Sequence, residues 1–449
     1  MEFEVGSTTR MIITVTFLIY SCVLIGVGLY AKRQMDKTAI DKYVQEFYTG
    51  GRRMGALVVA LMIAAGLCSA GTFLGGPGLG YSVGLSWVMA AFSQNFMNFC
   101  VLGEIGKKVG IVARRIDAQS YVDLFVYRYN HNKIVGLIGV VSIVVFMGSY
   151  VVAQFVGGAR LFETMTGFSY GFGLTLFAIV VLIYSAFGGI RGVSLAIVVQ
   201  GFVMTIAVFA LFIGGLRYIG SIEAATKTIA QINPKLISPW AWSPLYQFSL
   251  WLVFGLVFIG VPHGAMGCLV YRDTKVMHRA IILGTIFVVL WTIILPWLGQ
   301  LTRAVYPNLS VPDHAIPSLI MTVLPPWLAG LAVAGVAGAI QSTVGAMIIV
   351  ISSAIVKDAY RVYINPHAES EKLKKITIWS TIIICVAIFI CALFPPPALE
   401  WVIVFAIGGL AAAFFWPLLF GLYWMRANEY GAASSMIGGM ITYIIARGG

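Results

Sequence analysis

Apolar residues fill this chain in long runs separated by short polar stretches. Each run is close in length to the roughly 20 residues that a helix needs to cross the hydrocarbon of a membrane. Backbone N–H and C=O groups find no partner in lipid, so each run is expected to be helical. The runs lie at roughly 11–31, 54–76, 82–104, 134–157, 169–187, 193–216, 246–268, 280–302, 326–356, 376–394, 399–424 and 430–446. They predict an all-α polytopic membrane protein with about 12 transmembrane helices.

Two of these runs are interrupted by residues that break helices. The second run and its exit hold a cluster of glycines with Pro77 over 66–78, and the seventh holds Pro262 among glycines over 260–267. Proline removes a backbone donor and clashes with the preceding turn, and glycine weakens a helix by about 1 kcal/mol relative to alanine. Paired broken helices indicate a transport site near the middle of the membrane. The alternative, that the glycines serve close helix packing, stays open at this point.

The interrupted runs also suggest how the chain is organised. They are five runs apart, so the two helices cross the membrane in opposite directions. This spacing predicts two inverted five-helix repeats, 54–216 and 246–424, within a single transmembrane domain that spans 1–449. An extra first helix with its loop precedes the repeats at 1–53, and an additional helix follows them at 425–449.

Lysine and arginine are distributed unevenly among the connections between the runs. The chain carries 29 of them and a net charge of +12, and 22 of the 29 lie in the connections after odd-numbered runs. Cytoplasmic loops are rich in Lys and Arg, so these connections are expected to be cytoplasmic and the N-terminus to lie outside. The basic excess therefore indicates topology, and nucleic-acid binding is not expected.

Composition and acidic residues narrow the possible functions. The chain is 60% hydrophobic and 10% charged, against about 25% charged residues in a soluble domain. No Asp or Glu lies in the middle of a run, which disfavours proton coupling and leaves neutral oxygens as ligands for a cation. The runs hold no carboxylate pair, metal-ligand cluster or nucleophile constellation, so neither an enzyme nor a cofactor is expected.

Five polar side chains fall inside the runs and are candidates for a site. Ser342 and Thr343 are adjacent in the ninth run. From the residues alone, the favoured interpretation is that their hydroxyls bond back to carbonyls one turn earlier. Tyr150 and Gln154 in the fourth run either face a pathway or join helices, and both choices are open. His263 is better explained as a satisfied interior histidine than as a ligand.

Eight motifs in a fixed order resemble one family of transporters. They are YTGGRRMG (48–55), FLGGPG (73–78), FVGGARLFE (155–163), YSAFGGIRG (184–192), VPHGAMGCLVYRDTKVMHR (261–279), VPDHAIPSLIMTVLPPWLAG (311–330), AIQSTVGA (339–346) and GGLAAAFFWPLLFGLYWMRAN (408–428). Because these motifs occur together in this order and at this spacing, the chain resembles the sodium:solute symporters from about Tyr48 to Met436. The resemblance implies a LeuT-like core of ten helices in inverted repeats, preceded by one helix.

The resemblance also implies the residues of two sites. It assigns a sodium ion to the backbone carbonyls of Ala65, Cys68 and Ala339 and to the hydroxyls of Ser342 and Thr343. That assignment reverses the interpretation favoured above for the two hydroxyls. It places solute-lining positions at Ser69, Tyr150, Phe254 and Pro262, and Gln154 is kept as a further candidate.

Sodium-driven import of a small organic carboxylate by alternating access is the function that the resemblance implies. Motifs 261–279 and 311–330 favour pantothenate as the solute. Another sodium-coupled solute, an amino acid or a monocarboxylate, is the alternative, and a channel or a membrane sensor is a more distant one. The expected partners are sodium, the solute and the lipid of a plasma membrane.

Three departures from the family pattern qualify these expectations. Ile197 stands where many relatives carry an acid, which leaves a second ion site without that ligand. Leu67 stands where proline carriers have an acid, which argues against proline as the solute. The family commonly has a thirteenth helix, whereas twelve runs are found here.

Overall fold

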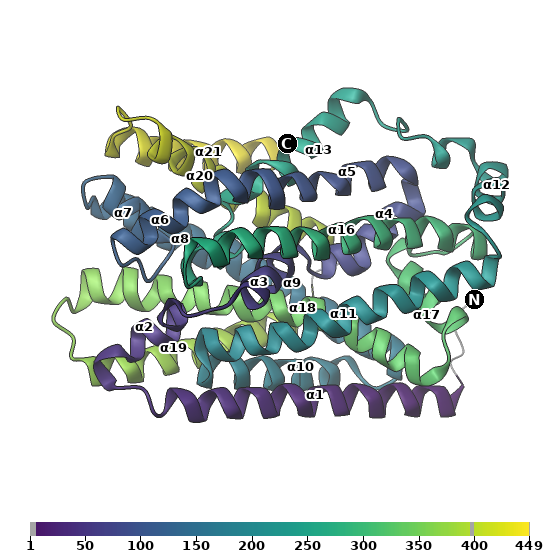
Figure 1. Cartoon of the computed structure of the whole chain (residues 1–449), viewed down its shortest axis with the longest axis horizontal. Coiled ribbons are helices and arrows are strands. Elements are labelled where there is room, and N and C mark those ends of the chain that lie inside the picture. Colours follow the sequence, from purple (N-terminus) through teal and green to yellow (C-terminus); the bar gives the residue numbers. More distant parts are fainter. Residues whose placement is uncertain (1–5, 396–398, 449) are drawn as a thin grey trace.

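The computed structural model describes residues 6–395 and 399–448. These residues are helical almost throughout, and the long helices lie side by side along the longest axis of the molecule (Figure 1). The helices are α1 Ser7–Met35, α2 Tyr43–Thr49, α3 Ala56–Leu67, α4 Gly76–Val83, α5 Leu85–Phe96, α6 Lys107–Arg115, α7 Val122–Arg128, α8 Lys133–Ser142, α9 Gly148–Thr166, α10 Tyr170–Leu182, α11 Gly189–Ile219, α12 Ile222–Ile232, α13 Pro244–Gly255, α14 Pro262–Ala265, α15 Gly267–Val270, α16 Thr274–Val305, α17 Ala315–Val323, α18 Pro326–Ser353, α19 Ser370–Ala392, α20 Leu399–Tyr423 and α21 Glu429–Gly448. The expected all-α fold is confirmed over this part of the chain.

Each expected run coincides with a helix or with a series of joined helices. Within the described ranges, eight helices are long and apolar enough to span a membrane, and two bent pairs raise that number to ten. The third predicted run corresponds to the helical residues 85–115, and the twelfth corresponds to α21. Both are long, but they are less apolar than those ten. Spanning by these last two helices stays a prediction.

Several helices extend past the expected runs, among them the third, which continues to Arg115 instead of 104, and the fourth, which continues to Thr166 instead of 157. The second run, expected to end at 76, continues through α4 to Val83. The ninth, expected to end at 356, continues to Ile364, because a stretch of wider helical turns follows α18 without a break. Asp358, expected at the end of a run, therefore lies within a continuous helical stretch and is buried.

The two interrupted runs are bent by nearly the same angle. The helix axes before and after the break differ by 65° between 56–67 and 71–83, and by 66° between 244–260 and 262–270. At the first break, Cys68 has an extended backbone (φ −110°, ψ 111°). The discontinuous helices predicted from glycine and proline are therefore present at both places, and the matching bends are what inverted repeats require. The repeat boundaries themselves stay a prediction.

Connections that follow odd-numbered runs meet at one end of the bundle. The ammonium of Lys357 lies 2.6 Å from an oxygen of Asp123, and a single backbone bridge joins Met54 to Tyr271. At the opposite end, Tyr81 donates to the carbonyl of Tyr306 at 2.7 Å. Figure 1 shows α2, α6 and α7 at one end of the long axis and α12 with the N-terminus at the other. This grouping is the one that the positive-charge pattern predicts.

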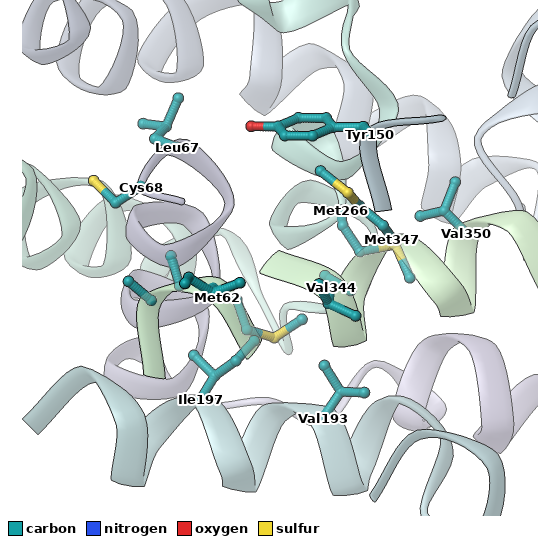
Figure 2. Packing of buried hydrophobic residues seen from close by; sticks show 14 of the residues in the cluster. Met62, Leu67, Cys68, Tyr150, Val193, Ile197, Met266, Val344, Met347 and Val350 are labelled. Carbon is teal, nitrogen blue, oxygen red and sulfur yellow. The ribbon is translucent and has the colours of Figure 1, made fainter. Parts of the chain in front are cut away.

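Helix α18 runs through the middle of the bundle, and nearly all of its residues are buried. Small residues in its first half allow neighbouring helices to approach closely. Figure 2 shows Val344 of α18 facing Val193 of α11, and Ile197 below Met62. Ile197 is 1% exposed within this apolar cluster. Its side chain therefore brings no oxygen to the protein interior.

Candidate ion and solute sites

Three backbone carbonyl oxygens converge on one hydroxyl at the first break. The Thr343 Oγ1 atom on α18 lies 2.9 Å from the carbonyl oxygen of Ala65, 3.1 Å from that of Cys68 and 3.1 Å from that of Ala339. We call these three oxygens the carbonyl cluster. A hydroxyl has a single proton, so it can donate to only one of the three at a time. The cluster is therefore rich in acceptors, as a site for a small cation must be.

The local chain explains why these carbonyls are available. Helix α3 ends at Leu67, so the carbonyls of its last turn lack the amide donors that a continuing helix would supply. The C-terminal end of a helix also carries partial negative charge. Unwound carbonyls and half-helix C-termini are the groups that hold sodium in discontinuous transporter helices.

The hydroxyls of Ser342 and Thr343 both bond back along their own helix, as the residues alone predicted, and that of Thr343 also contacts α3. Ser342 Oγ donates to the Ala339 carbonyl at 2.9 Å, so it bonds back along its own helix. Thr343 makes the same kind of bond and in addition reaches across to α3. All five residues to which the resemblance assigned sodium thus gather at one place, with Thr343 at its centre.

Side chains of α9 satisfy the unwound stretch that follows the carbonyl cluster. The Ala70 amide donates to Gln154 Oε1 at 3.0 Å, and Ser69 Oγ and the Tyr150 hydroxyl share a hydrogen bond of 3.0 Å. Figure 2 shows the Tyr150 ring extending with its hydroxyl toward the side on which Leu67 and Cys68 stand. Of the two choices left open above, Tyr150 and Gln154 therefore both join two helices at the site.

A cavity opens beside this stretch. Its free space is about 60 Å³, so the cavity must widen to hold a solute, because ligand pockets of small molecules are commonly about 300–1,000 Å³. Of the solute positions implied by the resemblance, Ser69, Tyr150 and Phe254 line it. Pro262 and Gln154 do not. Pro262 begins α14 and is buried, whereas Gln154 acts from behind the lining through the Ala70 amide.

Sequence reasoning missed four polar residues of the lining, one of which, Thr72, directly follows the first break. Trp87 and Gln94 come from α5, and Thr292 comes from α16. The indole nitrogen of Trp87 and the Oε1 atom of Gln94 are buried without a hydrogen-bond partner among the described residues. Gln94 and Thr292 are polar residues inside predicted apolar runs, which was a usable signal. Nothing in the sequence shows that α5 and α16 face the same cavity.

Comparison with known proteins agrees with this geometry. A model of the sodium:solute symporter family matches residues 47–439. The chain belongs to that family. It is therefore a multi-pass, sodium-coupled symporter and a transporter rather than an enzyme, as the motifs predicted.

Two relatives of this symporter are similar along nearly their whole length. The sodium/pantothenate symporter of Haemophilus influenzae is 38% identical over 96% of this chain and 90% of its own. The sodium/pantothenate symporter of Escherichia coli is 38% identical over 95% of this chain and 88% of its own.

A solved structure confirms the fold. A Na⁺-coupled sialic acid symporter, in its substrate-bound outward-open state, matches 97% of this chain and 98% of its own with a TM-score of 0.81. The two sequences are 19% identical, so this likeness concerns the fold alone. The LeuT-like architecture expected from the motifs is thereby confirmed.

Proposed function

We propose that this symporter imports pantothenate with sodium, and that sodium binds at the carbonyl cluster together with the hydroxyls of Ser342 and Thr343. The solute binds in the neighbouring cavity, with Ser69 and Tyr150 as contacts. The two relatives named for pantothenate support the choice of solute.

One observation carries the coupling between the two sites. The carbonyl of Cys68 belongs to the carbonyl cluster, and the side chain of the next residue, Ser69, lines the cavity. The two sites therefore share one unwound stretch of backbone. An ion that orders this stretch also fixes the position of Ser69, and a solute bound to Ser69 orders the ion's ligands.

The chemistry of the cavity suits an anion that also carries amide and hydroxyl groups, as pantothenate does. Among the described residues, its lining contains hydroxyls, an amide and an indole N–H, and no charged side chain. The helical stretch that starts at Gly71 ends the unwound segment beside the cavity, and the N-terminal end of a helix attracts negative charge. The unpartnered atoms of Trp87 and Gln94 are suited to the solute's carbonyl, hydroxyl and amide groups.

A second hollow supports access from the end where the N-terminus lies. It has a volume of about 760 Å³, its open side included, and it shares Gly71 and Ile403 with the solute cavity. Asp313 and His314, from the connection before α17, line its far part. Burial raises the pKa of the Asp313 carboxyl there. With this end outside, the symporter lies in the inner membrane with its N-terminus outside and takes up solute from there.

Uptake into proteoliposomes tests the proposal. Radiolabelled pantothenate is offered under an inward sodium gradient and, as a matched control, under an equal potassium gradient. We expect saturable uptake with sodium alone. Equal uptake under both gradients would overturn the sodium coupling. Uptake under neither would overturn pantothenate as the solute, and proline, other amino acids and monocarboxylates would then be offered in the same assay.

A further inference from the structure

Two hollows meet at the end of the bundle that is cytoplasmic in the proposed orientation, where Figure 1 shows α6 and α7 near α20 and α21. The larger hollow lies between α20 and α21 and has about 520 Å³ of free space. The smaller hollow lies between α6, α7 and α20 and has about 200 Å³. Tyr129 and Pro417 line both, so the two hollows share a wall. The larger one is of the size that holds a small molecule, roughly 300–1,000 Å³.

One wall of the larger hollow is a row of aromatic side chains. Trp416, Phe420 and Trp424 follow one another at intervals of four residues along α20 and its exit, and all three are exposed. The rings of Trp416 and Phe420 are stacked with their centres 5.3 Å apart, and Trp424 meets Phe420 edge-on at 5.4 Å. Tryptophan collects where the hydrocarbon of a membrane meets the headgroups. This wall is therefore suited to both the acyl chains and the headgroup of a lipid.

The charged side chains that line the two hollows are all arginines. Arg426, which follows α20, lines the larger hollow, and Arg115 and Arg128 line the smaller. Among the described residues, no Asp or Glu lines either hollow. Arg128 donates to three backbone carbonyls at the end of α20 and is held there. Arg115 and Arg426 are exposed, and the ion pairs and hydrogen bonds of the described residues do not include them.

This combination of an aromatic wall and two available guanidinium groups fits one kind of occupant. Basic pockets between membrane helices at the cytoplasmic side bind the headgroups of anionic lipids, and a guanidinium group binds phosphate through two parallel hydrogen bonds. A soluble phosphate compound would leave the aromatic wall uncovered. We propose that an anionic phospholipid of the cytoplasmic leaflet binds here, with its headgroup at Arg115 and Arg426 and its acyl chains along Trp416 and Phe420.

Helix α20 connects this lipid site to the transport machinery. Phe415, next to Trp416, packs against the second break so closely that a Cβ on Gly260 would lie 2.8 Å from the Phe415 amide nitrogen. Ile403 and Ile407, further along the same helix, line the solute cavity. A lipid that holds the end of α20 therefore steadies a helix that borders both the break and the cavity. The inference goes beyond the proposed function and does not depend on which solute is carried.

Lipid binding to the purified, delipidated symporter tests the inference. The protein in detergent is titrated with phosphatidylglycerol and, separately, with phosphatidylcholine of the same acyl chains, and the bound lipids are counted by native mass spectrometry. We expect phosphatidylglycerol to bind more tightly. A basic residue near anionic lipid contributes about fivefold in affinity. Arg115→Gln with Arg426→Gln should therefore weaken phosphatidylglycerol binding about 25-fold and leave phosphatidylcholine binding unchanged.

Two further variants separate the site from the overall charge of the protein. Arg33→Gln with Arg361→Gln removes the same charge from exposed positions on α1 and after α18 that line neither hollow. This matched control should bind phosphatidylglycerol as the wild type does. Ser435→Trp fills the larger hollow from α21 and should weaken the binding of both lipids.

Equal loss of phosphatidylglycerol in the two arginine double variants would assign the binding to net charge and overturn the site. Equal affinity of the wild type for the two lipids would also overturn it, as would full phosphatidylglycerol binding in Ser435→Trp. Displacement of the lipid by an equal concentration of glycerol phosphate would show that the hollow takes a soluble phosphate compound instead. These measurements use neither sodium nor pantothenate, so their failure leaves the proposed function untouched.

Discussion

The Thr343 hydroxyl oxygen on α18 lies 3.1 Å from the carbonyl oxygen of Cys68, although the two residues are 275 positions apart in the chain. Cys68 stands at the break of the first repeat, and Thr343 stands in a continuous, buried helix of the second. If sodium binds here as proposed, it contacts both repeats at once. Its arrival or departure therefore changes how the repeats are held together, which is what alternating access requires.

Removal of the two hydroxyls should weaken sodium activation. In Ser342→Ala with Thr343→Val, we expect the sodium concentration for half-maximal uptake to rise at least about tenfold, the equivalent of about 1.4 kcal/mol. Thr343→Val alone should account for most of this rise in sodium concentration, because Thr343 contacts three carbonyls and Ser342 contacts one. The measurement is uptake against sodium concentration.

Ser353→Ala is the matched control for this prediction. Ser353 lies on the same helix, is buried, and bonds back to the Val350 carbonyl at 2.8 Å, away from the break. Its sodium dependence should equal that of the wild type. An unchanged sodium dependence in the double variant would show that sodium does not bind at this site.

Loss of the Tyr150 hydroxyl should weaken solute binding. Tyr150→Phe keeps the ring but removes the hydrogen bond to Ser69, and such a bond contributes about 0.5–1.5 kcal/mol. We expect the solute KM at saturating sodium to rise about 2–10-fold. Tyr170→Phe, which removes a partly buried hydrogen bond to the Ala392 carbonyl outside both sites, should leave KM unchanged. Equal KM values for wild type and Tyr150→Phe would place the solute elsewhere.

Helices α4 and α16 approach so closely that neither tolerates a side chain at the contact. A Cβ on Gly299 would lie 1.9 Å from the Pro77 carbonyl oxygen, and one on Gly80 would lie 2.0 Å from that of Pro296. Overpacking of this kind costs about 1–3 kcal/mol, so Gly299→Ala should lower the melting temperature of the purified protein. Gly26→Ala on α1, where a Cβ meets nothing within 4 Å, should not. Equal melting temperatures would mean that the two helices separate readily.

The proposed orientation predicts which residues a membrane-impermeant thiol reagent reaches. In a background without the six native cysteines, Asn308→Cys should be labelled from outside intact cells, and Lys372→Cys only after the membrane is opened. Both residues are exposed, Asn308 in the connection between α16 and α17 and Lys372 in the first turn of α19. Reversed labelling would invert the topology. It would also place the hollow lined by Asp313 on the cytoplasmic side.

Local chemistry made much of the fold predictable. Apolar runs locate the helices because lipid forces every backbone group to pair within its own segment. Glycines with Pro77 and Pro262 mark the two breaks, which the structure places as expected. The expected end of the ninth run was wrong, because residues 357–364 include three charged residues yet continue the helix through contacts such as that of Lys357 with Asp123.

The candidate site was predicted less completely than the fold. The residues of the carbonyl cluster followed from family motifs, yet the residue pattern by itself favoured simple back-bonding for Thr343. Trp87 and Gln94 were missed because their role depends on which face of α5 meets the unwound stretch. Helical periodicity does not specify that face in a chain whose helices are apolar on all sides.

The amino-acid sequence by itself determined that this protein is a helical membrane symporter with two broken helices, because apolar run length, helix-breaking residues and motif order are local properties. Only the tertiary structure decided that Thr343 meets the Ala65 and Cys68 carbonyls and that Tyr150 and Gln154 hold the unwound stretch. The physical reason is distance along the chain. These contacts join helices from opposite repeats or from separate parts of one repeat, and their geometry is set by how the whole bundle packs.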